Sequence, residues 1–188
     1  MNNFCLSDDI MPEAEVALRL AFYLLSRPGS SNLVSVAIDG AQVQVGSKPI
    51  FPLAQFLEES GWRQIEQNGL RPWQGRYARQ DKTLEIHSNP GVGDVVIKIG
   101  NNWIRAECKK GYLIPRTGNP EYRLLREGIG QLMTIEQVTD SDVLIVAVPN
   151  SKRFHRLALN WRTRPLIKRC SIRIVLVDRN GSVDGIEI

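Results

Sequence analysis

The chain has 188 residues, with 24 lysines and arginines against 20 aspartates and glutamates and a formal net charge of +4. This length suffices for one substantial hydrophobic core and argues against two full domains, so we expect a single domain over residues 1–188. No apolar run reaches membrane-spanning length and no basic-then-apolar leader follows Met1, which favours a cytoplasmic protein without a membrane partner. The three cysteines lack paired zinc spacing and argue against a disulfide framework.

The first predicted element is a helix over residues 12–25. Its apolar residues recur at helical spacing, and Pro12 suits a first helical turn. Asp8 or Asp9 is a candidate N-terminal cap. The tripeptide at 27–29, Arg-Pro-Gly, ends the helix.

Residues 30–80 resemble an insertion placed after this helix. The run 34–45 predicts a hairpin that turns at Asp39-Gly40, and the run 52–60 predicts a short helix. A strand is then predicted over residues 83–87, leading toward the most informative part of the chain.

Residues 93–110 contain two apolar-rich runs that flank Asn101-Asn102. Asn tolerates the positive φ of a tight two-residue turn, so we expect one hairpin in which the numbers of opposed residues sum to 203. One face of that hairpin is wholly apolar. The other face carries Asp94, Glu107 and Lys109, with the two acids as diagonal neighbours roughly 7 to 8 Å apart.

The chemistry of these three side chains suggests a metal-dependent hydrolase. Carboxylate oxygens suit Mg²⁺ or Mn²⁺, which needs one or two protein carboxylates and completes its shell with water, carbonyls and substrate phosphate. Asp94 and Glu107 are the predicted metal ligands, and the Cys108 carbonyl is a candidate third ligand. Lys109 would orient the attacking water or stabilise charge on the scissile phosphate.

The pairing of Asp94 with Glu107-Cys108-Lys109 resembles the signature of the PD-(D/E)xK phosphodiesterases, the superfamily of restriction-endonuclease-like and Holliday-junction-resolvase-like nucleases. The resemblance implies an α/β (α+β) fold with an αβββαβ core around a central mixed sheet flanked by helices. Gly93 stands where the Pro of the signature would be. An acid-x-Lys tripeptide is expected about once by chance in such a chain, so the alternative is a charged, exposed hairpin face.

The resemblance also implies assisting residues on two helices. A first-helix acid often supplies a further metal ligand in such nucleases, and Glu13 and Glu15 are both available. The alternative is that both acids simply favour the helix N-terminus. Gln131 resembles a helical glutamine that binds the attacking water or a phosphate, although a solvated helix residue fits equally well.

The second half of the chain completes the αβββαβ order. Residues 121–136 predict a helix, and the apolar run 142–148 is typical of a central strand buried on both faces. A terminal hairpin over residues 171–178 and 183–188 is expected to turn at Asn180-Gly181 and extend the sheet.

Charge is segregated along the chain. Residues 151–173 hold eight basic residues and no acidic one, which leaves 16 basic residues against 20 acidic ones elsewhere. A one-signed segment of this kind is typical of a surface that follows a phosphate backbone, and we expect a helix with its basic side outward. The predicted nucleic-acid-binding residues are Arg76, Arg79, Lys110, Lys152, Arg153, Arg156, Arg162, Arg164, Lys168 and Arg169.

Together these features predict a Mg²⁺- or Mn²⁺-dependent endonuclease acting on DNA, with RNA left open as a substrate. A catalytically inactive nucleic-acid-binding module of the same fold is the main alternative, and an assembly subunit without affinity for nucleic acid is the third. A homodimer, as used by nucleases that cut two strands, is left open.

Overall fold

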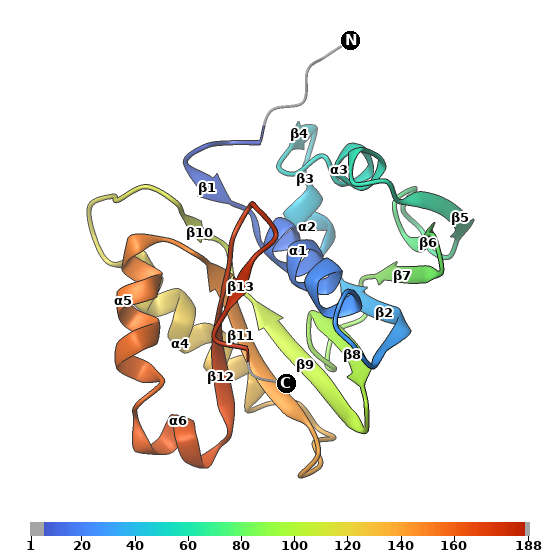
Figure 1. The fold of residues 1–188 in the computed structure, drawn as a ribbon. Coiled ribbons are helices and arrows are strands. Elements are labelled where there is room, and N and C mark those ends of the chain that lie inside the picture. Colours follow the sequence, from blue (N-terminus) through green and yellow to red (C-terminus); the bar gives the residue numbers. More distant parts are fainter. Residues whose placement is uncertain (1–5, 187–188) are drawn as a thin grey trace.

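The computed structural model describes residues 6–186 and is built around one large mixed β-sheet (Figure 1). The sheet has nine strands in the order β13-β12-β11-β9-β8-β2-β7-β6-β5. The bounds of these strands are β2 (Ser30–Ala37), β5 (Arg63–Gln67), β6 (Gly75–Arg79), β7 (Lys82–His87), β8 (Val95–Ile99), β9 (Asn102–Cys108), β11 (Val143–Pro149), β12 (Ile172–Val177) and β13 (Val183–Asp184).

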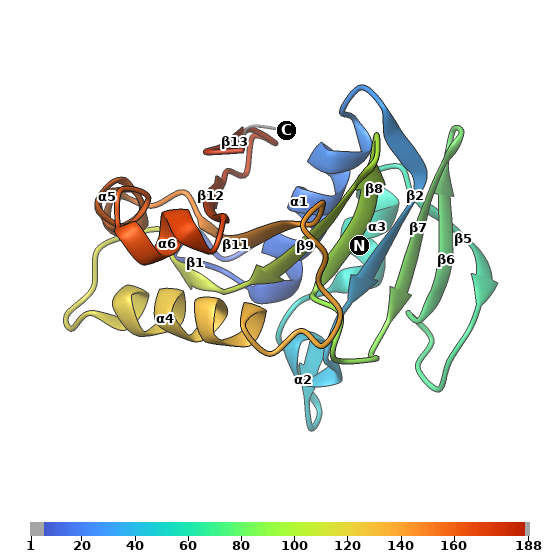
Figure 2. The same cartoon turned by 90° about the horizontal axis from the view of Figure 1, so that it is seen from below.

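Helices cover the two faces of this sheet unequally (Figure 2). The helices are α1 (Glu13–Leu25), α2 (Gly40–Val43), α3 (Leu53–Glu59), α4 (Pro120–Leu132), α5 (Lys152–Trp161) and α6 (Pro165–Arg169). Apolar residues of α1 and α3 share one buried core with the sheet, while those of α4, α5 and α6 pack in a second core on the other face. Two short pairs lie outside the main sheet: β1 (Ile10–Met11) with β10 (Gly111–Tyr112), and β3 (Gln44–Val45) with β4 (Lys48–Pro49). The expected α+β class, with a mixed sheet flanked by helices, is confirmed.

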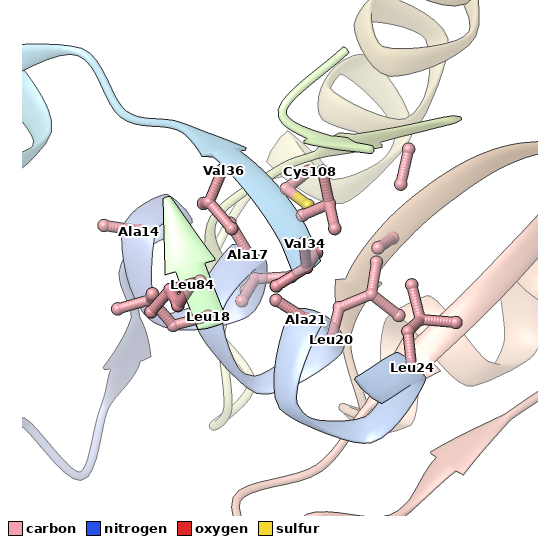
Figure 3. Packing of buried hydrophobic residues seen from close by; sticks show 14 of the residues in the cluster. Ala14, Ala17, Leu18, Leu20, Ala21, Leu24, Val34, Val36, Leu84 and Cys108 are labelled. Carbon is pink, nitrogen blue, oxygen red and sulfur yellow. The ribbon is translucent and has the colours of Figure 1, made fainter. Parts of the chain in front are cut away.

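The predicted first helix is confirmed as α1, and it lies at the centre of the larger core. Its buried side is rich in small residues such as Ala14, Ala17 and Ala21, which face Val34 and neighbouring sheet residues (Figure 3). Small side chains let the helix axis approach the sheet closely without leaving voids. The predicted cap was wrong, because Pro12 is the N-cap and no side chain caps the helix.

The predicted hairpin forms from β8 and β9, but its register differs by two residues. Val95 pairs with Ala106 and Ile99 pairs with Asn102, so paired numbers sum to 201 and the turn is Gly100-Asn101. Gly100 supplies the positive φ, 58°, at low steric cost. A shift of two residues keeps every side chain on its expected face, so the apolar and polar faces are as predicted.

The strand beside β8 is β2, which sequence patterning had placed in the insertion-like stretch. β2 runs antiparallel to β8 and parallel to β7, so the predicted strand 83–87 is confirmed as β7 but lies one position further out. The predicted turn at Asp39-Gly40 was wrong. The Asp39 carboxylate instead accepts a hydrogen bond from Ala41 N at 2.9 Å and caps α2, as Asp does at helix starts.

The remaining predicted elements are found close to their expected positions. The short helix at 52–60 is α3, the helix at 121–136 is α4, and the run 142–148 is β11, which is parallel to β9. β13 pairs antiparallel with β12, as expected for the terminal hairpin, and residues 187–188 lie outside the described part. The basic segment forms two helices, α5 and α6, where one was expected. Among residues 6–186, no helix combines the length and hydropathy needed to cross a bilayer.

Candidate active site

One edge of the sheet brings together five of the predicted site residues: Glu13, Asp94, Glu107, Lys109 and Gln131. β2 and β7 are parallel, β9 and β11 are parallel, and β8 runs antiparallel to its two neighbours, so four strands end at the edge where β8 begins. Two adjoining depressions of about 330 Å³ and 410 Å³ open there, and both are lined by Asp94 and Gln131. Glu107 lines the first, whereas Glu13 and Lys109 line the second.

Asp94 is fixed by backbone contacts just before β8 starts. Its N–H donates to Ala106 O at 2.7 Å, and its carboxylate accepts from Cys108 N at 2.7 Å. Gly93 makes this entry into the strand with φ 103°, a value that the ring of proline forbids. The departure from the Pro of the signature therefore has a local steric reason.

Asp94 and Glu107 are carboxyls in a partly desolvated, crowded environment. Burial raises the pKa of Asp94 to about 6, although the hydrogen bond from Cys108 N and the charge of Lys109 oppose the shift. Burial, together with the nearby charge of Asp94, raises the pKa of Glu107 to about 7. The 201 register ends at the pair Val95–Ala106, and Asp94, just before it, donates its N–H to Ala106 O at 2.7 Å, so Asp94 lies beside the residue that precedes Glu107. A cation bound between the two carboxylates would stabilise their charged forms and so lower both pKa values.

Lys109 follows β9 and is almost fully buried, with 3% of its surface exposed. Its Nζ donates to Glu13 Oε1 at 3.3 Å. Burial alone would lower its pKa, but the carboxylates of Glu13, Asp94 and Glu107 outweigh that effect and raise the pKa of Lys109. The lysine is therefore a fixed positive charge at the site.

The two first-helix acids have separate roles. Glu13 turns toward the cleft, where its carboxylate also accepts from Gln42 Nε2 at 3.0 Å and from Lys110 N at 3.4 Å. Glu15 is fully buried and binds the guanidinium groups of Arg19 and Arg179, at 2.8 and 2.9 Å respectively. The structure thus brings Glu13 to the site and does not bring Glu15 there.

Cys108 contributes its backbone and not its thiol. Its side chain is fully buried in the larger core, and burial raises the pKa of the thiol well above its ordinary value. The thiol is therefore unsuited to act as a thiolate ligand or nucleophile. The neighbouring Lys109 N–H donates to Ala147 O at 2.9 Å, which holds this part of β9 against β11.

Several residues of the cleft were missed by sequence reasoning. Asp39, Gln42 and Asn89 line the larger of the two depressions. Asp39 can start a helix as well as form a turn. A helix starting at Asp39 would have placed Gln42 on it. His87 is held by hydrogen bonds, 2.7 Å from Ser35 Oγ and 3.0 Å from Asn89 N, and serves the structure.

Size does not identify the site. A larger depression, about 790 Å³, lies at the opposite edge of the sheet and is lined by residues such as Asn102, Asp142 and Arg173. Two of its acids are neutralised by arginines, Asp184 by Arg162 at 3.0 Å and Asp142 by Arg105 at 2.7 Å. The cleft at Asp94 is smaller but gathers residues with shifted pKa values, which is a better sign of chemistry.

The predicted nucleic-acid-binding residues are spread over several elements. Three of them are engaged in ion pairs: Arg76 with Glu66 and Glu85, Arg153 with Glu121, and Arg162 with Asp184. Arg164 donates to Asn160 Oδ1 at 2.8 Å. Exposed predicted residues are Arg79 at the far end of β6, Lys110 after β9, Lys152 and Arg156 on α5, and Lys168 and Arg169 on α6.

The residues present fit a hard divalent ion that keeps much of its water shell. Among the described residues, no group of three or more His, Cys, Asp or Glu forms a complete metal cage. Asp94 and Glu107 still offer two crowded carboxylates on an open cleft, which is the number that Mg²⁺ takes when water and substrate supply the rest.

Comparisons with protein-family models, with curated proteins and with solved structures find no match to this chain. What the cleft can do is therefore inferred from its own geometry and charge.

Proposed function

We propose that this protein is a Mg²⁺- or Mn²⁺-dependent endonuclease that hydrolyses phosphodiester bonds in DNA. The observation that carries the proposal is the grouping of Asp94, Glu107 and Lys109 around one open cleft, with two carboxyls whose pKa values are raised by burial and a lysine that stays charged. This is the set of charges that in-line hydrolysis of a phosphodiester requires.

The topology supports the same proposal. Leaving out the segment between β2 and β8, the order α1, β2, β8, β9, α4, β11 corresponds to the αβββαβ order expected of a restriction-endonuclease-like core. The sheet neighbours β2, β8, β9 and β11 are contiguous, with the last pair parallel. Asp94 precedes the second of these strands, and Glu107 and Lys109 lie at the end of the third.

Asp94 and Glu107 would hold the metal, which when bound would lower the pKa of water and neutralise charge on the scissile phosphate. Lys109 would place its ammonium group against the attacking water or a phosphate oxygen, and Glu13 would keep that group in position. Gln131, exposed at the end of α4, would offer its amide to the water or to a phosphate oxygen.

The test is incubation of supercoiled plasmid and branched DNA with the protein in Mg²⁺ or Mn²⁺. The parent protein and a Glu58→Ala control, which changes an exposed acid of α3, should cut. Glu107→Ala and Lys109→Ala should not. A parent protein that binds DNA in a salt-sensitive manner and cuts nothing would instead identify a catalytically inactive binding module. A parent without affinity for DNA would refute both functions.

A further inference from the structure

The outer face of α4 is exposed along its whole length and leads into the cleft. Arg123, Arg126, Glu127, Gly130 and Gln131 are all exposed, while Leu125, Gly128 and Leu132 on the other side are buried. Figure 2 shows this helix on the outside of its layer, with no element covering the side away from the sheet. The exposed face ends at Gln131, which lines both depressions of the candidate active site.

Gly130 has no structural reason to be glycine in the free protein. It lies inside a helix, its φ is not positive, and a Cβ built on it would meet nothing within 4 Å. Glycine at such a position destabilises a helix relative to alanine. Gly128, two residues earlier, is different, because its added Cβ would lie 2.8 Å from Val146 Cγ1. An exposed helical glycine beside a cleft is explained if another backbone approaches that surface closely.

The two arginines on this face form no ion pair within the described part of the chain. Among the described residues, neither Arg123 nor Arg126 has a carboxylate partner, unlike Arg76, Arg153 and Arg162. The Arg126 guanidinium lies 5.7 Å from the centroid of the Tyr122 ring, which in turn packs edge-on against Trp161. That aromatic support fixes the guanidinium at the surface while leaving its N–H groups available.

The spacing along α4 matches a polyanionic strand. At a rise of about 1.5 Å per residue, Arg123 lies about 12 Å before Gln131, which equals the rise of roughly three to four base pairs along the axis of a duplex. Arg123 and Gly130 are separated by seven residues, about two helical turns, and so lie on the same line of the surface. Glu127 is the acidic exception on this face.

We infer that the outer face of α4 binds the sugar-phosphate backbone of the DNA strand that enters the cleft, with Arg123 and Arg126 contacting phosphates and Gly130 leaving room for the strand beside Gln131. This inference rests on the proposed nuclease function. It assigns the path of the substrate to residues outside the basic segment 151–173.

Binding of a fluorescent 20-base-pair duplex in EDTA, measured against salt concentration, tests the two arginines. Arg123→Gln with Arg126→Gln should reduce the slope of log affinity against log salt by about two, since each lost phosphate contact removes about 0.9. The same double change at Arg27, exposed after α1, and Arg63, exposed on the far strand β5, should leave the slope unchanged. Glu127→Gln should strengthen binding.

Gly130 is tested by separating stability from binding. Gly130→Ala and Gly130→Leu should raise the melting temperature, by about 2 °C for alanine, because both residues favour the helix. They should nevertheless weaken duplex binding, and Gly130→Leu should do so at least tenfold. Ala54→Leu, a matched change at an exposed position of α3, should not affect binding.

These experiments can refute the α4 binding surface without refuting the proposed nuclease function. If the α4 variants bind and cut as the parent does, while Glu107→Ala and Lys109→Ala abolish cutting, the surface is wrong and the nuclease function stands. If the parent neither binds nor cuts DNA, both are overturned. A loss of affinity in the arginine variants together with a stable, weakly binding Gly130→Leu supports the surface.

Discussion

Lys109 Nζ lies 3.3 Å from Glu13 Oε1, although 96 positions separate the two residues in the chain. The contact joins the N-terminus of α1 to the end of β9 and fixes the one buried lysine of the cleft. It also explains why a charged residue with 3% exposure is tolerated, since a buried charge needs a charged or hydrogen-bonded partner.

Substitution by glutamine should affect DNA cleavage at Glu13 and protein stability at Glu15. Glu13→Gln should change the free energy of unfolding by less than about 1 kcal/mol, because Asp94 and Glu107 still supply negative charge near Lys109 and the amide oxygen still accepts a hydrogen bond, but it should reduce DNA cleavage. Glu15→Gln should destabilise the protein by roughly 3 kcal/mol, because it leaves Arg19 and Arg179 without their buried counter-charge. Urea unfolding and a cleavage assay measure the two effects, and an equal loss of stability in both variants would contradict this division.

The cleft carboxyls should make the metal-free protein less stable as pH rises. The folded-state pKa values of Asp94 and Glu107, about 6 and about 7, exceed their ordinary values, so the folded state holds these protons more tightly. Their contribution to stability is present below about pH 4 and is lost as pH rises through 7. Glu107→Gln should therefore be more stable than the parent at pH 8 in EDTA, by on the order of 2 kcal/mol, with little difference at pH 4.

Urea unfolding at several pH values measures this effect, and Glu58→Gln is the control because it removes an exposed carboxylate from α3. A stability difference between Glu107→Gln and the parent that is independent of pH would show that Glu107 is not held in a costly environment.

A bound divalent ion should offset the loss of stability that the charged cleft carboxylates cause at high pH. At pH 8, Mg²⁺ or Mn²⁺ at about 100 times its dissociation constant should stabilise the protein by about 2.7 kcal/mol, because it binds the folded cleft. In a chain of this size that corresponds to a rise of several degrees in melting temperature. Asp94→Asn should lose this rise. Equal stabilisation of Asp94→Asn and the parent would place the ion elsewhere.

Gly128 should tolerate substitution poorly because α4 approaches β11 and Lys109 there. A Cβ at this position would lie 2.8 Å from Val146 Cγ1 and 3.4 Å from Lys109 Cγ. Gly128→Ala should destabilise the protein by about 1 kcal/mol, since the overpacking exceeds the gain in helix propensity. Thermal unfolding measures this, and a stabilised Gly128→Ala would mean that the helix can move away from the sheet.

The sequence predicted most elements and the correct face of each hairpin residue, because alternation along β8 and β9 is a local property. It could not give the register, since Gly100-Asn101 and Asn101-Asn102 are both acceptable two-residue turns with the same parity. The choice depends on how the pair fits the neighbouring strands, and in the structure it brings Asp94 beside Ala106, the residue before Glu107.

The sequence was least informative where the determinants are distant. The strand beside β8 is β2. No local pattern could show that the strands between them in sequence, β5, β6 and β7, extend the sheet on the other side of β2. The choice between Glu13 and Glu15 likewise depended on Arg179, which is 164 positions from Glu15. Helical spacing places the two acids on different faces but does not say which face meets the cleft.

The rate at which bound DNA is cut tests the central claim most directly. With DNA saturated by protein, single-turnover cleavage in Mg²⁺ should be measurable for the parent and for Lys48→Ala, an exposed lysine on β4. Lys109→Ala should bind the same DNA but cut it at least about 100-fold more slowly, because it lacks the charge that stabilises the transition state. A Lys109→Ala variant that cuts at the parental rate, or a saturated parent that cuts nothing in Mg²⁺ or Mn²⁺, would contradict the assignment of this cleft as a nuclease site.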